Sequence, residues 1–77
     1  MESTYFVVSG EFEDIGKLYF NRNGVWGEFS VFETVLAPNI KALNYHYQKW
    51  NKCDIEEDAG AKVEKISINV VFEDVIK

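Results

Sequence analysis

The spacing of the apolar residues changes twice along this 77-residue chain, and no other feature of the sequence restricts the fold as strongly. Residues 4–13 alternate between two sets of side chains, and residues 17–21, 25–31 and 63–76 are predicted to form three further strands. Before the last strand, apolar residues recur every three or four positions, the spacing of an amphipathic helix: Leu36, Ile40, Leu43, Tyr47 and Trp50. This order predicts an α+β fold (β-β-β-α-β), a two-layer sandwich in which one helix covers one face of a four-stranded, mostly antiparallel sheet.

Local signals place the helix and the connections. Pro38 is tolerated in the first turn of a helix but not in its interior, so the helix is expected to begin near Ala37, after a connection over residues 33–36. Residues 54–61 contain acids and a glycine without periodicity, which predicts a loop. The last strand is expected to run parallel to its neighbour through a right-handed crossover, and residues 1–77 to form one domain.

The dipeptide Asn23-Gly24 predicts a hairpin between the second and third strands, because it tolerates the two positive φ angles of a type I′ turn. A two-residue turn would place Asn21 opposite Trp26, so that Tyr19 and Trp26 point away from the helix. A four-residue loop would shift this register and turn Trp26 to the other face. In the two-residue register the side chains that face the helix are Leu18, Phe20 and Phe29.

The chain has two Trp, four Tyr and six Phe, more aromatic surface than one small core usually hides. The helix is expected to pack on one set of strand residues: Phe6, Val8, Phe20, Ile66, Ile68 and Val70. The sheet face without a helix is then expected to carry a patch of partly exposed apolar side chains: Tyr5, Val7, Tyr19, Trp26 and Val71. Such a patch is typical of a binding surface or a dimer interface, and its Trp and Tyr residues favour a protein partner.

Charge is unevenly distributed along the chain. Thirteen acids and eight bases leave a net charge of -5, yet residues 34–53 contain no acid and carry Lys41, Lys49 and Lys52. The simplest interpretation is a surface that keeps a small protein in solution. Two other interpretations are functional. In one, an acidic surface mimics a nucleic-acid backbone; in the other, a basic helix face with Tyr45 contacts nucleic acid.

Residues that could carry catalysis or hold a cofactor do not form a known pattern. The chain has one histidine, His46, and one cysteine, Cys53, and it lacks a calcium-loop, phosphate-loop or nucleotide-binding motif. We therefore expect no enzymatic activity, no cofactor and no metal. A single cysteine, the absence of a signal peptide and the absence of a long apolar segment predict a cytoplasmic protein without a membrane span.

These observations favour a non-catalytic protein-binding module, a small acidic inhibitor or adaptor that blocks a partner's surface. The residues expected to contact the partner are Tyr5, Tyr19, Trp26 and Val71 as anchors, with Glu11, Glu13, Glu56, Glu57 and Asp58 as steering charges. In composition the chain resembles small phage and mobile-element proteins of the anti-defence type, a resemblance that carries no motif. A homodimer through the aromatic patch is a further expectation, while nucleic acid remains the alternative partner.

Overall fold

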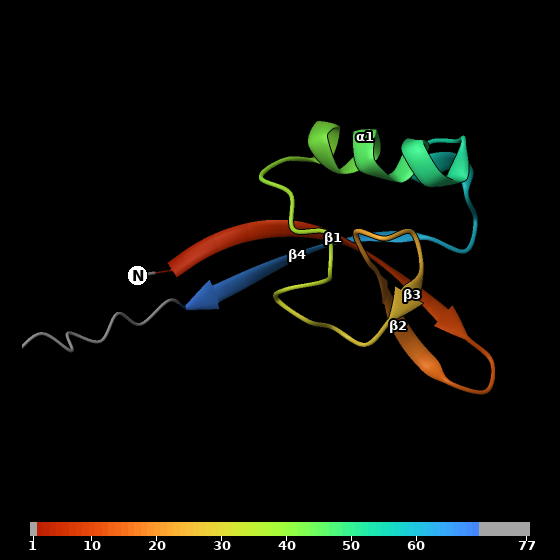
Figure 1. Cartoon of the computed structure of the whole chain (residues 1–77), viewed down its shortest axis with the longest axis horizontal. Helices are drawn as coiled ribbons and strands as arrows, with labels where there is room; N and C mark the ends of the chain where they lie inside the picture. Colours follow the sequence, from red (N-terminus) through yellow and green to blue (C-terminus); the bar gives the residue numbers. More distant parts are fainter. Residues whose placement is uncertain (1, 70–77) are drawn as a thin grey trace, which may run out of the picture.

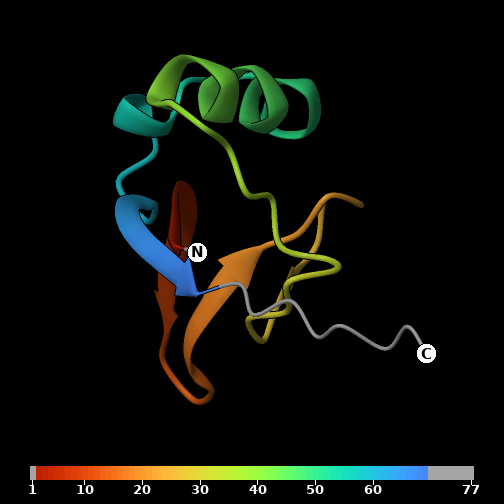
Figure 2. The same ribbon diagram turned by 90° about the vertical axis from the view of Figure 1, so that its left-hand side faces the viewer.

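The computed structural model describes residues 2–69, in which a helix lies on one face of an open sheet (Figures 1 and 2). All strand pairs are antiparallel, and the strand order is β3-β2-β1-β4. The elements in chain order are β1 (Glu2–Phe12), β2 (Gly16–Phe20), β3 (Trp26–Gly27), α1 (Ile40–Asn51), the short 3₁₀ helix η1 (Ile55–Glu57) and β4 (Lys62–Asn69). The predicted α+β fold class is confirmed. We call the sheet face toward α1 the inner face and the opposite one the outer face.

Strand β1 joins two different parts of the sheet. It pairs with β4 through residues 2–9, but with β2 only through residues 9–12, so β1 and β2 diverge on one side of Ser9. The extended segment 34–37 lies in this gap. Ala37 exchanges two backbone hydrogen bonds with Phe6, of 2.8 and 3.1 Å, and the Val35 N–H donates to the Phe20 carbonyl over 3.1 Å. The predicted connection before the helix therefore behaves as a short additional strand.

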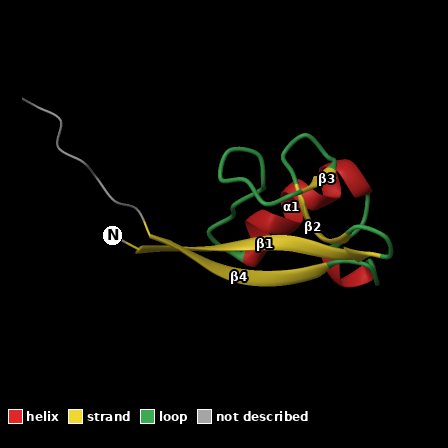
Figure 3. Cartoon of the chain, turned by 90° about the horizontal axis from the view of Figure 1, so that it is seen from below, coloured by secondary structure: helices red, strands yellow, loops and turns green. Residues whose placement is uncertain are grey.

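Segment 34–37 also explains why the last strand runs opposite to the predicted direction. Ala37 pairs antiparallel with Phe6, so the chain has already turned back relative to β1 before α1 begins. After α1 the chain turns once more, and β4 runs antiparallel to β1 (Figure 3). The predicted parallel crossover was wrong because it did not count this extra reversal.

The hairpin that joins β2 to β3 closes around a three-residue loop, 22–24, because a backbone hydrogen bond connects Asn21 and Val25. The Asn21 N–H donates to the Val25 carbonyl over 2.9 Å, and Phe20 lies opposite Trp26. Gly24 has a φ of 88° but Asn23 does not have a positive φ, so the type I′ turn is not formed. The register is shifted from the predicted one, and β3 ends at Gly27 instead of continuing to residue 31.

Helix α1 begins after Pro38 rather than around it. The side chain of Asn39 caps the first turn by accepting a 2.8 Å hydrogen bond from the Ala42 N–H, and the first helical residue is Ile40. At the other end, Lys52 adopts a left-handed conformation with a φ of 62°, and its N–H donates to the Gln48 carbonyl. The helix is therefore shorter at its start than predicted.

The core lies between α1 and the inner face. Its buried side chains are Val8, Phe20, Val35, Ala37, Leu43, Tyr47 and Ile55. The rings of Phe20 and Tyr47 lie 5.0 Å apart. Of the predicted helix stripe, Leu43 and Tyr47 are buried, whereas Ile40 and Trp50 are about half exposed.

Two predicted core residues of β4 lie on the opposite side of the sheet. Ile66 pairs with Tyr5 and Ile68 with Ser3, so both isoleucines are on the outer face. The expectation that they pack under the helix was wrong, because alternation along a strand does not say which of its two faces meets the core. Val70, also predicted in the core, lies outside the described residues.

Candidate functional site

The outer face of the sheet carries apolar side chains that α1 does not cover. Tyr5, Val7 and Tyr19 all lie on this face, as the alternation in β1 and β2 predicts. Val7 is fully buried, while Tyr5 and Tyr19 are partly exposed. Because part of this face remains accessible to solvent, it is the first candidate for a binding surface.

A shallow groove of about 370 Å³ lies on this face, and we call it the outer-face groove. It is lined by Tyr19, Phe29, Ile66, Ser67 and Ile68. The rings of Tyr19 and Phe29 meet edge to face at 5.5 Å, and Phe29 is 40% exposed. Phe29 was predicted to face the helix, and the shifted hairpin register explains why it does not.

The position of Trp26 differs most from the predicted patch on the outer face. Because it lies opposite Phe20, its side chain is on the inner face, where it packs against the core. Its ring centroid is 5.6 Å from that of Phe20 and 5.5 Å from that of Phe12. The predicted exposed position of Trp26 was wrong, and Val71, the other predicted anchor, lies outside the described residues.

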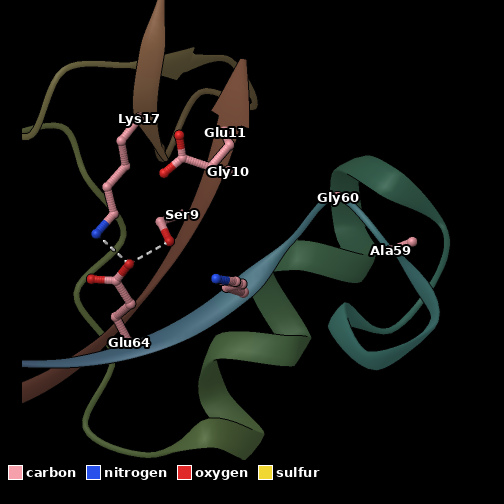
Figure 4. Close-up of a pocket in the computed structure, with 8 residues that line it drawn as sticks. Ser9, Gly10, Glu11, Lys17, Ala59, Gly60 and Glu64 are labelled. Atoms are coloured by element: carbon pink, nitrogen blue, oxygen red, sulfur yellow. Dashed lines mark hydrogen bonds and ion pairs between the residues drawn. The ribbon is translucent and has the colours of Figure 1, made fainter. Parts of the chain in front are cut away.

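A polar network lies beside Tyr19 of the outer-face groove. Figure 4 shows the three side chains of this network, Ser9, Lys17 and Glu64. The buried Ser9 hydroxyl donates a 2.7 Å hydrogen bond to Glu64 Oε2, and Lys17 Nζ lies 2.5 Å from the same oxygen. Lys17 Nζ is also 5.6 Å from the centroid of the Tyr19 ring, which connects the network to the groove. Ser9, Lys17 and Glu64 line a pocket of about 300 Å³ together with Glu11 and others.

The charges of this network stabilise each other. The Lys17 ammonium, and secondly the Ser9 hydroxyl, hold the pKa of Glu64 below its usual value, because both bond to the charged carboxylate. The same carboxylate raises the pKa of Lys17. The Ser9 hydroxyl and the Lys17 ammonium therefore both donate to one oxygen of the Glu64 carboxylate.

The acidic segment 54–58 is partly engaged within the chain. The Asp58 carboxylate accepts hydrogen bonds from the Tyr47 hydroxyl and from the Gly60 N–H, and the Glu57 carboxylate accepts one from the Asp54 N–H. Asp58 is half-buried, whereas Glu56, Glu57 and the other predicted steering acids, Glu11 and Glu13, are exposed. Asp58 therefore anchors this segment to α1 in addition to contributing charge.

Two titratable groups near this segment have raised pKa values. Burial, and then the hydrogen bond to Asp58, raise the pKa of Tyr47. Burial also raises the pKa of the Cys53 thiol, and Asp58 and Glu57 add to the effect. Because the thiolate is the nucleophilic form of cysteine, the raised pKa lowers the nucleophilic fraction of Cys53.

The basic face of α1 is exposed as predicted. Its solvent-facing residues are Lys41, Tyr45, Gln48, Lys49 and Lys52. Tyr45 is 70% exposed, and its ring meets that of His46 edge to face at 5.8 Å. Over residues 2–69, no three His, Cys, Asp or Glu side chains converge on a point where a metal ion could bind.

Comparisons of the chain with protein-family models, with curated protein sequences and with solved structures found no match. No helix between residues 2 and 69 has the length and apolar character needed to cross a lipid bilayer. Function is therefore inferred from the surfaces of the chain itself.

Proposed function

We propose that this chain is a non-catalytic protein-binding module, a small acidic inhibitor or adaptor that covers a partner's surface with its outer-face groove. The observation that carries the proposal is the groove itself, in which Tyr19, Phe29 and two isoleucines line a hollow of about 370 Å³ that α1 does not cover. Aromatic side chains at the centre of an apolar patch are enriched in protein interfaces, where a few of them supply most of the affinity.

The surroundings of the groove support a protein partner rather than a small ligand. The groove is shallow and bordered by the Ser9–Glu64–Lys17 network, so an apolar centre meets a charged rim. The net charge of -5 and the exposed acids would steer the chain toward a basic partner surface. In this proposal the groove provides most of the binding affinity, and the acidic side chains increase the rate of association.

Two exposed phenylalanines in one loop provide a matched test. Phe29 lines the groove, whereas Phe32 is 77% exposed and lies outside it. In affinity capture from a nuclease-treated lysate, Phe29→Ser should weaken capture of the partner by about 30-fold, the effect of an interface hot spot. Phe32→Ser should leave capture unchanged. Equal capture by both variants and the unmodified chain would refute the groove as the binding surface.

A second candidate function is nucleic-acid binding through the basic face of α1. The observation in its favour is the exposed Tyr45 beside Lys41 and Lys49, since an aromatic ring between cations can stack on a base. In this case capture would be lost on nuclease treatment, and Lys49→Glu would abolish it while Phe29→Ser would not. The two functions thus make opposite predictions in one experiment.

A further inference from the structure

The pocket of about 300 Å³ beside the polar network is not used by the proposed function, and we call it the Ser9 pocket. Its volume lies at the lower end of the range of roughly 300–1,000 Å³ that is typical of small-molecule sites. Two acids and two bases line it, together with three residues that have little or no side chain: Gly10, Ala59 and Gly60. The pocket therefore combines open space with charges of both signs.

The strand register places the four charged residues of the pocket around Ser9. Lys62 of β4 lies opposite Ser9, and Glu11 of β1 lies opposite Lys17 of β2. Glu11 is two residues from Ser9, and Glu64 is two residues from Lys62, so the alternation in β1 and β4 directs all of them to the outer face. Figure 4 shows Glu11, Lys17 and Glu64 near Ser9.

One acid and one base of the pocket are already paired with each other. Lys17 Nζ contacts Glu64 Oε2, which also accepts the hydrogen bond of the Ser9 hydroxyl. Glu11 and Lys62 are exposed, and neither forms a salt bridge with any residue between 2 and 69. The pocket therefore presents one carboxylate and one ammonium group to a ligand.

We propose that the Ser9 pocket binds a free α-amino acid, whose ammonium group bonds to Glu11 and whose carboxylate bonds to Lys62. A ligand with a single charge would leave one of these two side chains without a partner, whereas an α-amino acid carries both charges on one carbon atom. The inference goes beyond the proposed function, because neither Glu11 nor Lys62 lines the outer-face groove.

Titration of the purified chain with alanine tests the proposal. Because Glu11 and Lys62 are exposed, water weakens their bonds to the ligand, and we expect a dissociation constant in the millimolar range. Saturable NMR shifts of the Gly10 and Gly60 N–H groups, which belong to the pocket lining, measure this constant.

Two analogues of similar size each lack one charge of alanine. Lactate has a hydroxyl group in place of the ammonium group, and alaninamide has an amide in place of the carboxylate. Each should bind about 3- to 10-fold more weakly than alanine, because each leaves one charged side chain unpaired. The absence of a saturable shift with alanine, or equal binding of alanine and either analogue, would refute the proposal.

Neutral variants assign each charge of the ligand to one side chain. Glu11→Gln should remove the preference for alanine over lactate, and Lys62→Gln should remove the preference for alanine over alaninamide. The matched controls, Glu13→Gln and Lys65→Gln, make the same charge changes at exposed residues outside the pocket and should keep both preferences. Circular dichroism verifies that the four variants fold. If Glu11→Gln and Lys62→Gln behave like the controls, the proposal is wrong.

The groove variant separates the amino-acid site from the protein-binding surface. Phe29→Ser should weaken capture of the protein partner but leave the dissociation constant of alanine unchanged, because Phe29 does not line the Ser9 pocket. Lys62→Gln should weaken alanine binding and leave capture unchanged. Loss of alanine binding in Phe29→Ser would place the ligand in the outer-face groove and overturn its assignment to the Ser9 pocket.

Discussion

Replacing Gly24 with alanine tests how the β2–β3 loop is held against α1. Gly24 has a φ of 88°, and a Cβ atom at this position would lie 2.6 Å from Cδ2 and Cε3 of the Trp50 ring. Trp50 is in the last turn of α1, so the ring covers the backbone of the loop. The matched control is Gly16, which has a φ of 95° and where an added Cβ atom would meet no other atom within 4 Å.

The two substitutions share one energetic cost and differ in another. An alanine in the left-handed region costs about 1–2 kcal/mol at either position. At Gly24 the Cβ is also much closer to the ring than the optimum carbon–carbon separation of about 3.5–4.0 Å. Overpacking of this kind costs about 1–3 kcal/mol, so Gly24→Ala should lose about 2–5 kcal/mol and Gly16→Ala about 1–2 kcal/mol.

Urea denaturation of Gly24→Ala, Trp50→Ala and the double variant measures the contact directly. Since Trp50→Ala removes the ring, Gly24→Ala should cost only about 1–2 kcal/mol in that background. The double-mutant cycle should therefore give a coupling of about 1–3 kcal/mol. A coupling near zero, or equal losses for Gly16→Ala and Gly24→Ala in the unmodified background, would refute the packing of Trp50 on the loop.

Three further substitutions, the first with a control at Ile40, test the core, the polar network and the helix end by denaturation. Leu43→Ala should cost about 2–5 kcal/mol because Leu43 is fully buried, while Ile40→Ala on the exposed side should cost about 0.5 kcal/mol or less. Because the pKa of Glu64 is lowered in the folded chain, its stabilisation is present above its ordinary value of 4.5 and is lost as the pH falls through the lower folded pKa. Glu64→Gln should therefore be less stable than the unmodified chain at pH 7, and the difference should shrink below pH 4.5; a constant difference would contradict the ion pair. Lys52→Gly should raise the free energy of unfolding by about 0.5–1 kcal/mol, because glycine relieves the left-handed backbone at the end of α1, and a loss would contradict that geometry.

Much of the secondary structure follows from local sequence signals. The alternation in residues 4–13 correctly separates Val8, on the inner face, from Tyr5 and Val7, on the outer face. The helical spacing places Leu43 and Tyr47 correctly in the core, but it also places Ile40 and Trp50 there, which are about half exposed. These properties are local, because a side chain's direction relative to its neighbours depends only on the period of its own element.

The remaining features depend on contacts between elements. Periodicity places Ile66 and Ile68 on one face of β4, but only pairing with β1 decides that this face is the outer one. Likewise, Asn23-Gly24 indicates a hairpin but not the length of its loop. The loop has three residues and lies against Trp50, and this length sets the register of β3. The register in turn places Trp26 against the core and Phe29 in the outer-face groove. The order of the main strands and the helix, and the relative side-chain directions within each, were thus determined by the sequence alone. Loop length, strand direction and the face that meets the core were decided by the tertiary structure, because a shift of one residue exchanges the two faces of a strand at little local cost.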